Sequence, residues 1–66
     1  MNLRVNGEET DVPEGTSVAD LLDRLGIPRE QTAVERNREI VPRGRHEETV
    51  LAEGDVIEIV TAVGGG

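Results

Sequence analysis

The absence of aromatic and cysteine side chains is the strongest constraint on how this chain can fold. Its 66 residues include no Phe, Tyr, Trp or Cys, so no disulfide can staple the fold and the core must be aliphatic. A domain this small buries only about 60% of the surface that its unfolded chain exposes. We therefore expect one domain with a single well-packed aliphatic core, and no room for a substantial catalytic pocket beside it.

The N-terminal segment predicts a β-hairpin. Leu3 and Val5 alternate with polar neighbours, which is the period-two pattern of a strand with one buried face. The Asn6-Gly7 dipeptide that follows is the strongest short signal for a type I′ turn. The return strand is expected over residues 9–12, and Pro13 ends it because proline lacks the backbone donor.

A helix is predicted after Ser17. Ser17 and Asp20 have the spacing of a capping box, in which each side chain accepts a hydrogen bond from the other residue's backbone N–H. The apolar side chains that follow recur at helical spacing and form one stripe: Val18, Leu21, Leu22 and Leu25. Gly26 suits the left-handed position that ends a helix, and Ile27 would then pack back on Leu22.

The second half of the chain predicts short segments that precede one long strand. In chain order they are a short strand over residues 33–37, another over 40–41, a polar loop over 43–49 and a turn over 53–55. Val50 and Leu51 are expected in the core. The last strand begins at Val56 and runs through the most hydrophobic stretch of the chain, residues 56–63.

The order of these elements predicts an α+β fold. One helix cannot cover both faces of a sheet, so it must lie across one face of a mixed sheet of four to five strands. The simplest arrangement places the first and last strands side by side and parallel at the centre, joined by a right-handed crossover that carries the helix. This is the β-grasp, or ubiquitin-like, fold. We expect residues 1–63 to form this domain and residues 64–66 to form a flexible tail.

Charge and composition disfavour several classes of function. The formal charge of −7 disfavours nucleic acid and anionic membranes as partners, and it favours a partner with a basic groove. The chain has no Lys, and therefore neither a Schiff-base residue nor an internal acceptor for an isopeptide bond. It has no secretory signal and no apolar run near the roughly 20 residues that span a bilayer. We therefore expect a cytoplasmic protein.

The single Ser and the single His do not predict a catalytic or metal site. Ser17 could be a nucleophile, but its place before an apolar stripe favours helix capping. His46 lies in a polar loop beside Glu47 and Glu48, so we interpret it as solvated surface, and one His cannot make a metal site. We expect no metal site, no cofactor bound by the chain itself and no enzymatic activity of its own.

The glycine run Gly64, Gly65 and Gly66 directly follows the predicted last strand. Such a run is often a frayed end or a linker. Here it follows a strong strand, and residues without Cβ can approach another surface closely and extend roughly 10 Å across a protein wall. The run therefore predicts a delivery arm whose reactive group is the Gly66 carboxylate, which is ionised at neutral pH.

A partner that takes this tail must pass close to the residues before it. The alternation of the last strand places Ile57 and Ile59 toward the helix, and Glu58, Val60 and Ala62 on the open face of the sheet. Val60 and Ala62 are either simple strand formers or an apolar grip for the partner. The sequence leaves both interpretations open.

The full set of segments closely resembles the sulfur carrier proteins of thiamine biosynthesis, the ThiS family. The segments that carry the resemblance are the Asn6-Gly7 dipeptide and residues 18–22, 33–37, 40–43, 53–55 and 57–66. One departure is His46, where many members have Trp, and this concerns the packing of the loop and not the tail. The molybdenum-cofactor sulfur carriers share the fold and the tail, but they are usually longer and often have an aromatic residue near their end.

The resemblance implies a mechanism for the tail. An E1-like adenylating enzyme (ThiF) would bind ATP and take Gly64 and Gly65 into its site, and the Gly66 carboxylate would attack the α-phosphate to form an acyl adenylate. A persulfide derived from a cysteine desulfurase would displace AMP and leave a thiocarboxylate. Thiazole synthase (ThiG) would then take the sulfur into the thiazole ring.

Other classes of function remain open beside this one. A molybdopterin-synthase-type sulfur carrier would use the same tail for another acceptor. A ubiquitin-like protein modifier would join Gly66 to a target lysine, and an interaction domain would have the glycine run only by chance. The intact mass of the protein isolated from its host separates a thiocarboxylate from a free carboxylate and from a lysine conjugate.

Overall fold

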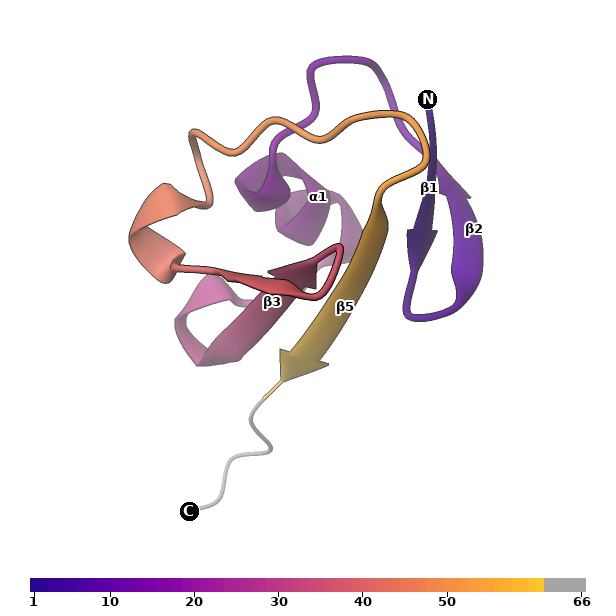
Figure 1. Cartoon of the computed structure of the whole chain (residues 1–66). Coiled ribbons are helices and arrows are strands. Elements are labelled where there is room, and N and C mark those ends of the chain that lie inside the picture. Colours follow the sequence, from indigo (N-terminus) through magenta and orange to yellow (C-terminus); the bar gives the residue numbers. More distant parts are fainter. Residues whose placement is uncertain (62–66) are drawn as a thin grey trace.

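A computed structural model describes residues 1–61, which form a five-stranded sheet with one α-helix across one of its faces (Figure 1). The strands lie in the order β2-β1-β5-β3-β4. Their bounds are Asn2–Val5 (β1), Glu8–Asp11 (β2), Thr32–Arg36 (β3), Glu39–Val41 (β4) and Val56–Thr61 (β5). The helix α1 spans Val18–Leu25, and two short 3₁₀ turns are η1 (Arg29–Gln31) and η2 (Arg43–Arg45). The predicted boundary between residues 1–63 and 64–66 lies outside the described residues.

The sheet is mixed because its first and last strands are parallel neighbours. β1 pairs with β5 in parallel, with Arg4 beside Val56, and the β1–β2, β3–β4 and β3–β5 pairs are antiparallel. This confirms the predicted β-grasp arrangement. The first hairpin is also confirmed, although its return strand is Glu8–Asp11, one residue earlier than expected. The turn consists of Asn6 and Gly7 alone, both with positive φ (50° and 84°) as a type I′ turn requires.

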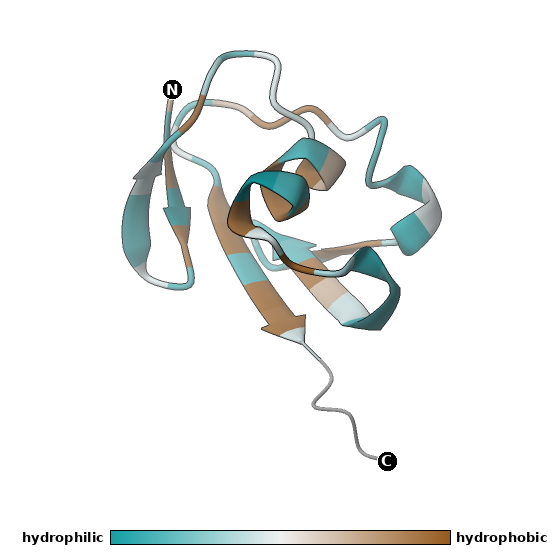
Figure 2. Cartoon of the chain, turned by 180° about the vertical axis from the view of Figure 1, so that it is seen from behind, coloured by the Kyte–Doolittle hydropathy of each residue, from teal (hydrophilic) through white to brown (hydrophobic). Residues whose placement is uncertain are grey.

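Helix α1 covers one face of the sheet and leaves the other face open. Figure 1 looks onto the open face with the helix behind the sheet, and Figure 2 shows the helix in front. The core lies between these two layers, and each of its members is aliphatic: Leu3, Val5, Val12, Val18, Leu21, Leu22, Val34, Val41, Leu51, Ile57 and Ile59. Burial of each such side chain contributes about 1.5–3 kcal/mol before conformational entropy is counted.

Both ends of α1 agree with the sequence prediction. Ser17 Oγ accepts a hydrogen bond from the Asp20 N–H at 3.1 Å, and Asp20 Oδ2 accepts one from the Ser17 N–H at 3.2 Å. At the other end, Gly26 has a φ of 70°, and the Ile27 N–H donates to the Leu22 carbonyl at 2.9 Å. Ser17 is therefore a helix cap, and the turn at Gly26 brings Ile27 back against the core.

Two apolar residues that were expected in the core are largely exposed instead. Leu25 is 43% exposed, because the helix ends at this residue and Ile27 packs against the core in its place. Val50 is 54% exposed, whereas Leu51 is 4% exposed. Val50 lies in an extended segment that forms a β-bridge with Ser17. Successive side chains of such a segment point to opposite sides, so the Leu51 side chain points into the core and the Val50 side chain points away from it.

The interpretation of His46 as solvated surface is wrong. Its side chain is 1% exposed, and its Nε2 lies 3.1 Å from the Val41 carbonyl oxygen. The segment predicted as a polar loop begins with η2, and the His46 carbonyl then accepts a hydrogen bond from the Ala19 N–H at 2.9 Å. These two contacts tie His46 to the end of β4 and to the first turn of α1, which turns the imidazole inward.

Candidate functional site

The end of β5 is the part of the described structure closest in sequence to the glycine run. Along β5, Ile57 and Ile59 are 0% and 8% exposed, whereas Val60 is 65% exposed and Glu58 is also exposed. The predicted alternation of the last strand is therefore confirmed at these four residues. The other predicted site residues, Ala62, Gly64, Gly65 and Gly66, lie outside the described residues.

Asn6 fixes the backbone of β5 near this end. Its N–H donates to the Ile57 carbonyl at 2.9 Å. Its side-chain amide then bridges Ile59, with Oδ1 accepting from the Ile59 N–H at 2.7 Å and Nδ2 donating to the Ile59 carbonyl at 3.3 Å. Because β1 turns away into the hairpin at this point, the amide replaces the strand partner that β5 would otherwise lack.

Asn37 has the equivalent role at the start of β5, on the opposite side. It lies in the turn between β3 and β4 with a φ of 51°. Its Oδ1 accepts a hydrogen bond from the Val56 N–H at 2.9 Å, and its Nδ2 donates to Asp55 Oδ1 at 3.0 Å. Thus β5 is held along its length by an asparagine from each hairpin turn. The sequence indicated the first turn, but not that its side chain binds a strand more than fifty residues away.

Asp55 joins the turn before β5 to the end of β3. It is 7% exposed, and it accepts hydrogen bonds from the Ala52 N–H, from Asn37 Nδ2 and from Arg36 Nε. Burial by itself raises the pKa of Asp55, but these three hydrogen bonds and the positive charge of Arg36 outweigh it and hold the pKa below its ordinary value. The folded protein therefore stabilises the ionised carboxylate.

We expect the stability of the fold to fall on acidification because of this carboxylate. The pKa of Asp55 is lower in the folded state than in the unfolded chain, where an aspartate has a pKa of about 3.9. Its contribution is therefore fully present above that unfolded value and is lost as the pH falls through the folded value. Urea unfolding of the wild type and of Asp55→Asn, at pH 7 and at successively lower pH, measures this. The wild type should lose more free energy of unfolding than the variant, and parallel losses would contradict the assignment.

Three exposed residues of β3 and β4 lie beside Glu58 and Val60 on the open face. The register of β5 with β3 places Val60 beside Ala33 and Glu58 beside Glu35, and the register of β3 with β4 places Glu35 beside Ile40. Ile40 is 72% exposed. We refer to these five residues, Ala33, Glu35, Ile40, Glu58 and Val60, as the open-face patch. Only its two β5 members, Glu58 and Val60, could be placed on this face from the sequence.

A shallow hollow adjoins this patch at the end of β5. It has a volume of about 330 Å³ and is lined by residues of η1, β3 and β5, together with Arg43. Val60 and Ala33 form part of its wall. The hollow thus adjoins the patch on both β3 and β5. A partner seated there would contact Val60, which shortly precedes the glycine run in the sequence.

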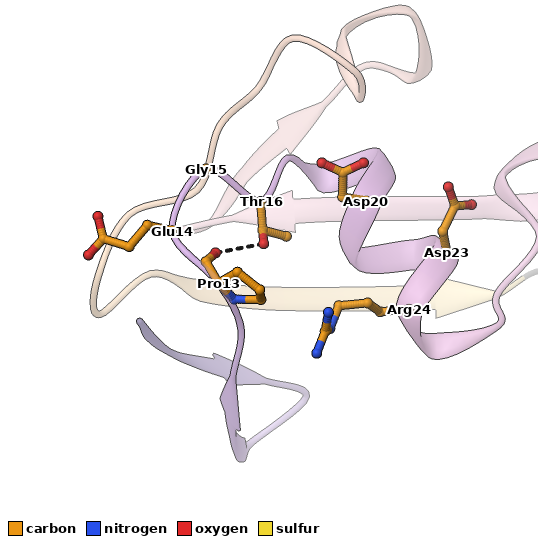
Figure 3. A pocket seen from close by; sticks show the side chains of 7 residues that line it. All are labelled: Pro13, Glu14, Gly15, Thr16, Asp20, Asp23 and Arg24. Atoms are coloured by element: carbon orange, nitrogen blue, oxygen red, sulfur yellow. Dashed lines mark hydrogen bonds between the residues drawn. The ribbon is translucent and has the colours of Figure 1, made fainter.

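A larger hollow, of about 560 Å³, lies elsewhere (Figure 3). Its lining comes from the loop before α1 and from the exposed side of the helix: Pro13, Glu14, Gly15, Thr16, Asp20, Asp23 and Arg24. Two of these polar groups already serve the local structure. Thr16 Oγ1 donates to the Pro13 carbonyl at 2.7 Å, and Asp20 accepts the capping hydrogen bond from Ser17. No residue of the open-face patch lines this hollow, so we do not assign it to the tail.

Two general features of the described residues bear on the site. Residues 1–61 contain no group of three or more His, Cys, Asp or Glu side chains placed to hold a metal ion. No helix within this part of the chain is long and apolar enough to cross a membrane.

Comparisons with known proteins agree on one family over almost the whole chain. The family model described as "ThiS family" matches residues 2–66. The sulfur carrier protein ThiS of Bacillus subtilis is 40% identical over 65 residues, an alignment that covers 97% of this chain and 98% of the relative. The crystal structure of a thiamine biosynthesis protein (ThiS) from Geobacter metallireducens superposes with a TM-score of 0.85 at 36% identity, and each chain is covered completely.

Relatives of a second kind are much longer. The thiazole synthases of Paramagnetospirillum magneticum and Magnetococcus marinus are 42% and 44% identical over 66 residues. The alignment includes 100% of this chain but only 20% of each relative. This chain therefore spans about a fifth of the length of these thiazole synthases, which contain a segment similar to it.

Proposed function

This chain belongs to the ThiS family, and on that premise we propose that it is a sulfur carrier in thiamine biosynthesis, with the Gly66 carboxyl group as the site of sulfur attachment. The observation that carries the proposal is that the family match extends through residue 66 and so includes the glycine run. The chain acts as a co-substrate of other enzymes and not as a catalyst, and we place its reactions in the cytoplasm.

The proposed chemistry begins with an E1-like adenylating enzyme (ThiF). Gly64 and Gly65 lie in its site, and a Gly66 carboxylate oxygen attacks the α-phosphate of ATP, which releases pyrophosphate and forms an acyl adenylate. ATP is bound by the partner, and this chain binds no cofactor itself. Glycines suit this task because a segment without Cβ atoms can pass between the walls of a narrow site.

Sulfur then replaces AMP on the acyl carbon. The terminal sulfur of a persulfide, made by a cysteine desulfurase, attacks the Gly66 carbonyl carbon, and AMP leaves. Cleavage of the resulting S–S bond by a thiol leaves the thiocarboxylate on Gly66 and a disulfide on the donor side. The thiocarboxylate is the form that transfers sulfur.

Thiazole synthase (ThiG) is the proposed acceptor enzyme. The support for this assignment is that two proteins named thiazole synthase contain a segment 42% and 44% identical to this chain. A carrier segment within the same polypeptide as its acceptor enzyme has a high effective concentration at the acceptor site. The same matches favour thiamine biosynthesis over a molybdopterin-synthase-type carrier, which remains the alternative together with a ubiquitin-like modifier.

Reconstitution with purified partners tests the proposal. The protein is incubated with ATP, the adenylating enzyme, a cysteine desulfurase and cysteine, and its intact mass is measured. The expected product is heavier by the difference between one sulfur and one oxygen atom. A mass that stays unchanged with an active adenylating enzyme, or a product joined to lysine of another protein, would contradict sulfur carriage.

We further expect Val60→Asp to weaken docking of the partners. Val60 is 65% exposed, and it lines the hollow at the end of β5. A charge there would have to lose its hydration in an apolar contact. Titration calorimetry with the adenylating enzyme and with thiazole synthase should show weaker binding. The fold should remain intact, because surface substitutions seldom change stability by more than about 0.5 kcal/mol.

The matched control for this variant is Val50→Asp. Val50 is also largely exposed, at 54%, but it lies on the segment bridged to Ser17 and away from the open-face patch. Both variants should keep the circular dichroism of the wild type, and only Val60→Asp should lose affinity. If both partners bind Val60→Asp with wild-type affinity, the interface lies elsewhere.

A further inference from the structure

Glu35 and Glu58 lie directly opposite each other on the open face. They are in register between β3 and β5, and both residues are exposed. Side chains in this relation have Cβ atoms about 4.5–5.5 Å apart, and two like charges there destabilise a sheet. The isolated protein thus has an electrostatic repulsion at the centre of the open-face patch.

No basic side chain of residues 1–61 forms an ion pair with either glutamate. The ion pairs in this part of the chain join other groups: the Met1 ammonium to Asp11, Arg29 to Glu47 and Arg36 to Asp55. Arg4 on the neighbouring strand β1 is in register with Val56 and not with Glu58, so it faces the pair only along a diagonal. Neither carboxylate is therefore engaged in an ion pair within residues 1–61.

Apolar side chains stand on two sides of the pair. Ala33 and Val60 are in register with each other and occupy the next exposed row toward the end of β5. Ile40 lies beside Glu35 and is 72% exposed. A partner that covers these apolar side chains must also remove water from two carboxylates between them. That removal is unfavourable unless the partner supplies positive charge at the same point.

We propose that the Glu35–Glu58 pair receives an arginine side chain of thiazole synthase when the open-face patch docks on that enzyme. A guanidinium has five N–H donors in a planar fork, which lets one side chain bind two carboxylates at once. This inference rests on the proposed function and adds the charge that its partner must present. Thiazole synthase is the partner because two proteins of that name contain a segment like this chain.

The proposal has opposite consequences for the free protein and for the complex. Neutralising one glutamate removes the repulsion, so the free protein becomes more stable. The same change removes one of the two negative charges that the guanidinium contacts and replaces a carboxylate oxygen by an amide NH₂ group, so the complex becomes weaker. A purely structural role of either residue would not produce this combination.

The test uses the full chain and its cognate thiazole synthase. Titration calorimetry measures Kd for the wild type, Glu35→Gln, Glu58→Gln and the double variant, with Glu48→Gln as the control. Glu48 is an exposed glutamate in the segment after η2, outside the open-face patch. Each single variant should raise Kd about tenfold, because the hydrogen bond to the guanidinium loses the charge of its acceptor. The midpoint of thermal unfolding should rise by about 1–5 °C.

The remaining outcomes decide the proposal. The double variant should raise Kd by less than the product of the two single effects, because both glutamates bind one cation. The proposal would be overturned if the single variants changed Kd no more than Glu48→Gln does. It would also be overturned if their midpoint of thermal unfolding were lower than that of the wild type. Intact-mass analysis of Glu58→Gln after reconstitution keeps the two questions separate. If the variant gains sulfur normally but Kd is unchanged, the arginine contact fails and the carrier function stands.

Discussion

Deletion of Gly66 should abolish adenylation and leave the fold unchanged. The core residues all lie between Leu3 and Ile59, so the fold does not depend on the last glycine for its burial. The shortened chain still ends in a carboxylate, on Gly65, but its reach falls by about 3.3–3.6 Å. A reacting atom misplaced by even about 1 Å can slow a reaction by two orders of magnitude. Exchange of pyrophosphate into ATP by the adenylating enzyme measures the effect.

Gly44→Ala is the matched control for this deletion. A Cβ at Gly44 meets nothing within 4 Å, and its φ lies outside the left-handed region, so the substitution is free of strain and leaves the glycine run itself unchanged. Exchange with this variant should equal that of the wild type. Exchange at wild-type rates by the protein that lacks Gly66 would refute the assignment of the reactive carboxylate. A change in its circular dichroism would show that the glycine run contributes to folding.

Leu22→Ala should remove most of the stability of the protein. Leu22 is 0% exposed and lies on the buried side of α1. Truncation of a buried leucine costs about 2–5 kcal/mol, and whole domains are stable by only about 5–15 kcal/mol, with small ones at the lower end. Urea unfolding followed by circular dichroism gives the free energy of unfolding directly.

The same helix provides the control for this substitution. Leu25 is 43% exposed, so Leu25→Ala removes a side chain that is only partly in contact with the core. Its effect should stay within about 0.5–1 kcal/mol. Equal losses for the two leucines would mean that the helix packs on the sheet through a different side. If Leu22→Ala lowered the midpoint of thermal unfolding by only a degree or two, the buried side of the helix would likewise be assigned wrongly.

Local signals account for the parts of the fold that could be predicted. The capping box of Ser17 and Asp20, the left-handed Gly26 and the turn at Asn6-Gly7 each depend on residues close together in sequence. The errors arose where the signal is not local. The packing of Ile27 against the core left Leu25 at its edge, 43% exposed, and the direction of one extended residue left Val50 54% exposed. Neither can be read from hydrophobicity alone.

His46 was missed because a single polar residue has no periodicity. Its neighbours Glu47 and Glu48 are exposed, and they made the whole segment look solvated. The one available signal was that many members of the ThiS family have Trp at this position. A position that accepts Trp is large enough to bury an imidazole, and the His46 side chain is 1% exposed.

The site could be predicted only along one strand. Period-two alternation was sufficient to place Glu58 and Val60 on the open face, but their neighbours come from β3 and β4. Ala33 and Glu35 join them through the register of β3 with β5, which is a non-local pairing that short sequence patterns do not specify. The residues proposed to react, Gly64 to Gly66, were identified from the sequence, and the family match extends over them.

The parallel pairing of β1 with β5 also determines when the protein can fold during its synthesis. Arg4 and Val5 pair with Val56 and Ile57, so the centre of the sheet pairs residues near the start of the sequence with residues near its end. Contacts of such large sequence separation slow folding, and the closing strand leaves the ribosome after every other element. A nascent chain that stalls before β5 lacks Ile57 and Ile59 from its core. Such a chain cannot cover the apolar side of α1, so the buried face of the helix has a complete partner only once β5 has been synthesised.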